Sequence, residues 1–125
     1  MNMNTCINVA NTINEQIFWS IDKWTYFSWG VSKKIACYYE GKPSLKLRVS
    51  GLLHKGWVII SLDEGRDLYE VHLLNLKDEV KKVVEEVYCD ELGYTIDTLV
   101  ERPETMNDEV YYKKAMADSK RKMNK

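Results

Sequence analysis

The chain has 125 residues, of which 45% are hydrophobic and 30% charged, and its formal net charge is −1. This composition is typical of a soluble globular protein with one hydrophobic core, and it excludes an intrinsically disordered chain. The near-neutral charge also argues against a strongly basic nucleic-acid-binding protein, although it allows a local basic patch. We expect a single domain over residues 1–125, with poorly ordered ends at about 1–10 and 122–125.

Cysteine usage and the start of the sequence indicate a cytoplasmic protein. Cys6, Cys37 and Cys89 are far apart, and none belongs to a C-x-x-C pair. An odd number of isolated cysteines favours reduced thiols over a disulfide framework. Residues 1–5 lack the basic and apolar regions of a signal peptide, and no apolar run approaches the roughly 20 residues that span a bilayer. We therefore expect no membrane association.

The first helix is predicted to run from Thr12 to about Asp22. Thr12 and Glu15 have the spacing of a capping box, in which both side chains satisfy free backbone N–H groups at the start of a helix. Isoleucines recur at helical spacing after this cap. The aromatic run 24–29 favours a strand instead, and Gly30 permits a bulge or a bend.

The middle of the chain contains three runs of β-branched, aromatic and aliphatic residues, the pattern of an antiparallel meander. These runs cover 45–49, 57–62 and 68–74. A further strand is expected at 33–39, as an extension of the aromatic run or as a short partner, before a turn at 40–43. Because side chains alternate between two faces of a strand, the core face is predicted to carry Leu45, Leu47, Val49, Val58, Ile60, Leu62, Tyr69, Val71 and Leu73.

The stretch 76–104, which has nine acidic and four basic residues, is ambiguous between helix and strand. Its apolar residues fit a helical stripe, whereas the valine-rich run 80–87 has strand preference. We favour a helix from Asp78, with a fifth strand at about 79–85 as the alternative.

A firmer helical pattern covers 89–101, and Pro103 ends it. A second C-terminal helix is predicted from about Asn107, because an acidic first turn and a basic last turn suit the helix dipole. These elements predict an α+β domain with an N-terminal helix, an antiparallel meander sheet of four or five strands, and two C-terminal helices.

Three stretches of the chain carry a resemblance to known proteins, and they are Phe27–Ser32, Leu47–Val58 and Val87–Gly93. They resemble a group of small uncharacterised proteins from phages and other mobile elements of gut anaerobic bacteria, and the resemblance extends over about Thr12–Met123. It implies a cytoplasmic protein of a bacterial host or its phage, with a role played through binding. It carries over no catalytic residue.

No motif for catalysis, nucleotide binding or a metal centre is present in the sequence. The acidic turn 63–67 lacks the ligand spacing of an EF-hand. His54 and His72 have no further ligands at metal-binding spacing, so we expect no metal and no cofactor. An acid–base pair of His72 with Glu70 is geometrically possible on one strand face, but no nucleophile motif accompanies it.

The face opposite the predicted core face combines an aromatic ring, Trp57, with the cations Lys46 and Arg48. Trp and Arg are enriched in protein-binding hot spots, and aromatic and cationic groups together can also bind bases and phosphates. Helices covering both faces, with Trp57 in the core, are the alternative. We predict a non-catalytic binding or adaptor protein that contacts a protein partner or forms a homo-oligomer, with single-stranded nucleic-acid binding as the second hypothesis. The candidate binding residues are Trp57, Lys46, Arg48, Ile59, Glu70 and His72.

Overall fold

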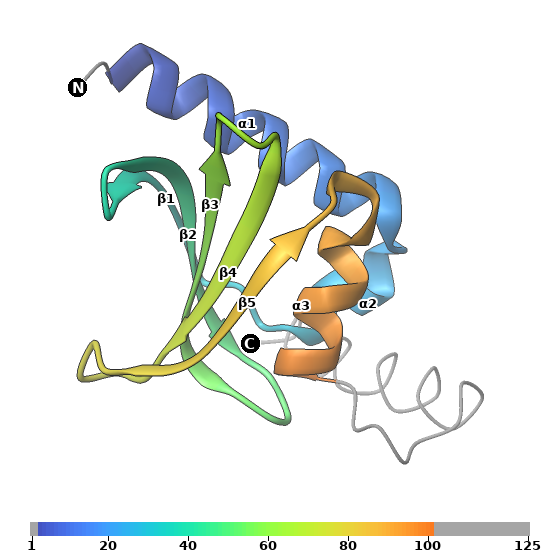
Figure 1. The fold of residues 1–125 in the computed structure, drawn as a ribbon. Helices are drawn as coiled ribbons and strands as arrows, with labels where there is room; N and C mark the ends of the chain where they lie inside the picture. The colour runs from blue at the N-terminus through green and yellow to red at the C-terminus, as the bar shows by residue number, and fades with distance from the viewer. Residues whose placement is uncertain (1–2, 102–125) are drawn as a thin grey trace.

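The computed structural model describes residues 3–101, which form an α+β domain around a five-stranded antiparallel sheet (Figure 1). The strands lie in the sheet in their sequence order, so the predicted meander is confirmed, with the alternative fifth strand included. The predicted helix from Asn107 and the predicted disorder at 122–125 lie outside the described residues. The elements are α1 (Met3–Ser20), α2 (Lys23–Ser28), β1 (Lys33–Tyr39), β2 (Lys42–Ser50), β3 (Lys55–Asp63), β4 (Leu68–Leu74), β5 (Val80–Val87), the 3-10 helix η1 (Cys89–Glu91) and α3 (Leu92–Val100).

Helix α1 begins at Met3, well before the predicted capping box, so the expected disorder is wrong for residues 3–10. Thr12 lies inside the helix, where its hydroxyl donates a hydrogen bond to the carbonyl of Asn8 at 3.0 Å. The helix extends toward the N-terminus because it has a longer apolar stripe than the isoleucines alone indicate. The buried residues of this stripe are Cys6, Ala10, Ile13 and Ile17.

The aromatic run 24–29 lies mostly in helix α2, and the predicted strand is wrong. The Asp22 side chain caps the helix by accepting a hydrogen bond from the Thr25 backbone N–H at 2.8 Å. At the other end, Gly30 adopts a positive φ of 62°, and its N–H donates to the Phe27 carbonyl at 3.1 Å. These capping interactions at both ends outweigh the strand preference of the aromatic side chains.

Residues 80–87 form strand β5, so the predicted helix from Asp78 is wrong in this part. β5 pairs with β4 in an antiparallel register that contains irregularities, and Val87 is buried. Helical structure resumes only at η1 and α3, whose residues Leu92, Ile96 and Val100 are buried at a spacing of four residues.

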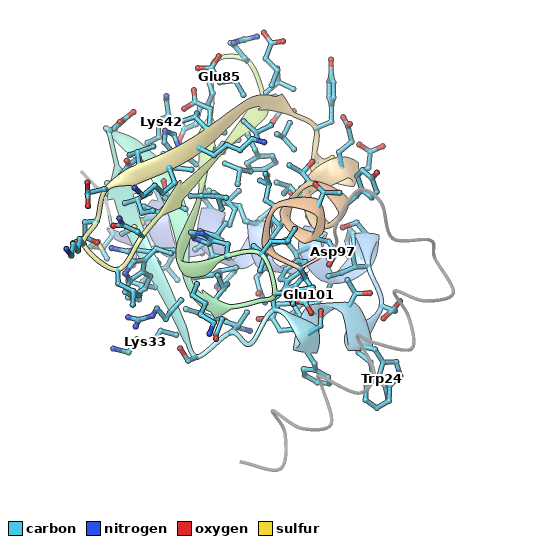
Figure 2. The ribbon with its side chains drawn as sticks, turned by 90° about the horizontal axis from the view of Figure 1, so that it is seen from below. Trp24, Lys33, Lys42, Glu85, Asp97 and Glu101 are labelled. Carbon is cyan, nitrogen blue, oxygen red and sulfur yellow. The ribbon has the colours of Figure 1, made fainter. Side chains whose placement is uncertain are left out.

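Helix α3 approaches both α1 and α2 closely. The Gly93 N–H donates to the Ser20 hydroxyl at 3.1 Å, and a Cβ at this glycine would collide with Ser20 and Ile21. The Trp29 indole N–H, just after α2, donates to the buried Asp97 carboxylate at 2.9 Å. Asp97 is a residue of α3 and Glu101 directly follows this helix, and both are labelled in Figure 2. These contacts fix the three helices as one layer.

The helical layer packs on one face of the sheet, which we call the first face. Of the nine residues predicted for the core face, eight are buried and Leu62 is partly buried against them. The predicted alternation of the strands is therefore confirmed. We call the opposite side of the sheet the second face. No helix within residues 3–101 is long and apolar enough to cross a lipid bilayer.

Candidate functional site

The strand register arranges the second face in rows that run across β1, β2, β3 and β4. The first row is Lys33, Arg48, Trp57 and Leu74. The second row is Ile35, Lys46, Ile59 and His72. The third row is Cys37, Ser44, Ser61 and Glu70. Figure 2 shows Lys33 and Lys42 on the same side of the molecule and Trp24 on the other side. The face thus has a cationic end around Trp57 and a mixed polar end around Glu70.

Trp57 and its two cations form the best-defined cluster at the cationic end. Lys46 Nζ lies 4.4 Å from the centroid of the Trp57 ring, and Arg48 Cζ lies 5.3 Å from it. These are cation–π distances, so the ring holds both side chains in place. Within residues 3–101, neither cation forms an ion pair with a carboxylate. The structure therefore brings together three of the six predicted site residues, and neither positive charge is paired with a carboxylate of the described part of the chain.

Ile59 and His72 lie beneath this surface instead of forming it. Their relative exposures are 1% and 5%, although both point away from the helical layer. Ile59 pairs in register with Lys46, and the His72 ring packs against Tyr39 with 4.9 Å between the ring centroids. Neither residue can touch a partner unless the covering side chains move, so the accessible candidate site is narrower than the sequence predicted.

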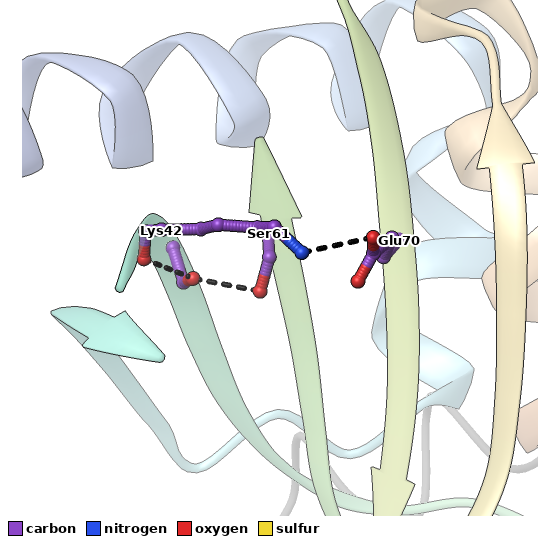
Figure 3. A network of polar contacts seen from close by, with 4 residues as sticks. Lys42, Ser61 and Glu70 are labelled. Atoms are coloured by element: carbon purple, nitrogen blue, oxygen red, sulfur yellow. Dashed lines mark hydrogen bonds and ion pairs between the residues drawn. The ribbon is translucent and has the colours of Figure 1, made fainter. Parts of the chain in front are cut away.

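At the polar end, an ion pair closes over two buried serines. The Lys42 side chain crosses β3 next to Ser61 and places Nζ 2.9 Å from Oε1 of Glu70 on β4 (Figure 3). Beneath it the hydroxyls of Ser44 and Ser61 hydrogen-bond each other at 2.8 Å, and Ser44 also donates to the Lys42 carbonyl at 2.9 Å. The hydrogen bond to Glu70 raises the pKa of Lys42. Both buried hydroxyls are thus satisfied by each other and by the Lys42 carbonyl.

Next to this ion pair, the structure adds a residue that the sequence analysis missed. One ligand atom each of Glu40, Glu70 and His72 lies within 4.8 Å of the others. His72 Nδ1 is buried and has no hydrogen-bond partner among the described residues. The sequence placed Glu70 and His72 on one strand face. It contained no signal for Glu40, because Glu40 belongs to the turn between β1 and β2 and reaches β4 only through the curvature of the sheet.

Two other features are separate from the second face. His54 has a structural role, because its Nε2 lies 3.2 Å from the Trp57 carbonyl and donates a hydrogen bond to it. A pocket of about 340 Å³ lies between α1 and η1, beside Trp19, which is 82% exposed. Its lining residues are Gln16, Trp19, Ser20, Cys89 and Asp90. The three cysteines are unpaired, as expected for reduced thiols.

Comparisons of the chain with protein-family models, with curated protein sequences and with solved structures find no match.

Proposed function

We propose that the protein is a small non-catalytic binding protein that recognises an acidic surface on a protein partner through Trp57, Lys46 and Arg48. In this proposal it acts in the cytoplasm of a bacterial host and is encoded by a phage or mobile element, as the sequence resemblance implies. The observation that carries the proposal is the pair of cations over one aromatic ring, with no carboxylate paired to either within residues 3–101.

This arrangement suits an acidic protein surface for three reasons. Contact with the Trp57 ring orders both long side chains before binding, which lowers the conformational entropy lost in a complex. The Arg48 guanidinium can bind a carboxylate through two parallel hydrogen bonds. The half-buried Trp57 adds apolar contact area beside the charges, as aromatic hot spots do. Lys33, paired with Arg48 in register, extends the positive charge to the sheet edge.

Single-stranded nucleic acid is the second candidate, because the same cations could pair with phosphates. Two observations favour the protein partner. Lys46 and Arg48 already lie over the Trp57 ring, so a stacking base would have to displace them. Tyr39, another ring placed on this face, is already engaged, because it packs edge-on against the buried His72 with 4.9 Å between the ring centroids. Proteins that bind single strands commonly provide a series of stacking rings.

A capture experiment with matched variants tests the protein partner. Tagged wild-type protein, Lys46→Gln/Arg48→Gln and Lys77→Gln/Lys81→Gln are each incubated with nuclease-treated bacterial lysate. The last variant is the control, because it removes the same charge at exposed positions near and in β5. We expect wild type and control to retain a protein that Lys46→Gln/Arg48→Gln loses, with retention falling as salt rises. Equal retention by all three proteins would contradict the assignment of this surface.

Fluorescence anisotropy with labelled single-stranded DNA and RNA tests the second candidate. Nucleic-acid binding through these cations would weaken steeply with salt, because phosphate contacts release counterions. If wild type and the control bind nucleic acid and Lys46→Gln/Arg48→Gln does not, the proposed partner becomes a single-stranded nucleic acid instead of a protein. Absence of binding at micromolar protein in low salt would remove this candidate.

A further inference from the structure

At the polar end of the second face, we infer that Glu40, Glu70 and His72 form a binding site for a divalent transition-metal ion. The side chains come from the β1–β2 turn and from β4, and one ligand atom of each lies within 4.8 Å of the other two. One imidazole nitrogen and two carboxylate oxygens are donors that Zn²⁺ and its neighbours in the first transition row accept. This inference is independent of the surface around Trp57.

The geometry is close to that of a metal site. Two ligands that each lie about 2.1 Å from one ion are at most about 4.2 Å apart, so the group needs only a small contraction. Glu40 can provide it, because its side chain is exposed and free to rotate toward Glu70 and His72. Three protein ligands leave one position of a tetrahedral ion open to water.

His72 provides a second, independent indication of a ligand. The relative exposure of His72 is only 5%, yet its Nδ1 has no hydrogen-bond partner within residues 3–101. A buried polar atom without a partner is destabilising and rare in native proteins. The Tyr39 ring packs edge-on against the imidazole and restricts its orientation. The fold thus leaves a donor without a partner on the same imidazole ring that contributes one ligand atom to the group with Glu40 and Glu70.

Lys42 is the competitor for this site. Its ammonium group lies 2.9 Å from Glu70 Oε1, so a positive charge already sits against one of the three proposed ligands. An arriving metal ion must displace the ammonium group. The Lys42 side chain retains 31% exposure and can turn into solvent. Replacing Lys42 by an uncharged residue of similar length should therefore strengthen metal binding, an effect that a purely structural role for Glu40 or His72 does not produce.

Isothermal titration calorimetry of the full chain with ZnCl₂ tests the inference. We expect one Zn²⁺ per chain, both in wild type and in Cys37→Ser/Cys89→Ser, which removes the two thiols that are not fully buried. Glu40→Gln changes an exposed turn residue and should weaken binding at least about tenfold. Glu15→Gln is the matched control on the exposed side of α1 and should bind as wild type does. Lys42→Met should bind Zn²⁺ more tightly than wild type.

Three results would overturn the inference. The first is no heat of binding in wild type, and the second is equal affinity in Glu40→Gln and Glu15→Gln. The third is loss of binding in Cys37→Ser/Cys89→Ser, which would assign the metal to thiols. Weaker binding by Lys42→Met would contradict the placement of the ion at Glu70.

Discussion

The two faces of the sheet are made by alternate residues of the same strands, but they are covered in different ways. The first face is covered by helices, and its side chains form one apolar cluster with them. On the second face Ile59, Ser61 and His72 are as inaccessible as core residues, although their neighbours on that face are long polar and aromatic side chains. Lysine and arginine can cover apolar surface with their methylene groups while their charges stay in water. Low exposure therefore does not by itself identify a core residue. A residue covered by packed helices is held more rigidly than one covered by long side chains that can move.

Truncation of two neighbouring isoleucines on opposite faces gives the largest expected difference in the free energy of unfolding. Ile60→Ala should lower the free energy of unfolding by about 2–5 kcal/mol, because the helices hold the cavity open. Ile59→Ala should cost less, about 1–2 kcal/mol, because mobile side chains of the second face can settle into the gap. Urea denaturation of both variants measures the difference. Equal losses would show that both faces are equally rigid.

Truncation of Trp57 should have a smaller effect on stability. Trp57→Ala should lower the free energy of unfolding by about 1 kcal/mol, well below the 3–5 kcal/mol typical of a fully buried tryptophan. The reason is that the ring is half-buried and its cover consists of Lys46 and Arg48. Trp29, which is fully buried, provides the matched comparison through Trp29→Ala. If both truncations destabilise the protein equally, Trp57 belongs to a core and the proposed binding surface loses its anchor.

The sequence predicted the two faces correctly because strand alternation is a local property. The positions of Ile60 and Val71 on the first face, and of Trp57 on the second, follow from the period of two residues alone. The prediction failed where tertiary contacts decide between local alternatives. The valine-rich run 80–87 is compatible with a helix or a strand, and pairing with β4 selects the strand.

The candidate site was predicted only in part, for a similar reason. Lys46, Arg48 and Trp57 lie on adjacent strands in neighbouring rows, so alternation and a correct register bring them together. Glu40 is brought to His72 by the curvature of the sheet and the position of a turn, and neither is encoded in a short sequence pattern. The sequence also gave no measure of how deeply Ile59 and His72 are covered by their neighbours.

The ion pair over Ser61 should contribute least to stability. Lys42→Met removes the charge but keeps a chain of similar length over the serine hydroxyls, so its effect on urea denaturation should be smaller than that of Trp57→Ala. A larger effect would mean that the charge itself, and not the aliphatic cover, holds this end of the second face together.

The rates at which the three cysteines are alkylated provide a comparison that needs no mutation. Cys6 is a fully buried residue of α1, Cys37 is partly buried on β1, and Cys89 is exposed. Burial raises the pKa of Cys37, so at neutral pH less of this thiol is in the reactive thiolate form. We expect iodoacetamide to label Cys89 first, Cys37 more slowly and faster as pH rises, and Cys6 only after unfolding. Mass spectrometry of quenched time points gives the order in which the cysteines are labelled. Early labelling of Cys6 would contradict its burial in the folded protein.

The most direct test of the cationic surface is quenching of tryptophan fluorescence by ions of opposite charge. Iodide and caesium are titrated into wild-type protein and into Trp57→Phe at constant ionic strength, and the difference between the two proteins isolates Trp57. Because Lys46 and Arg48 lie over a half-buried ring, the Trp57 component should be quenched more strongly by iodide than by caesium. A Trp57 component that neither ion quenches, or that caesium quenches more strongly, would contradict an open cationic surface at this position.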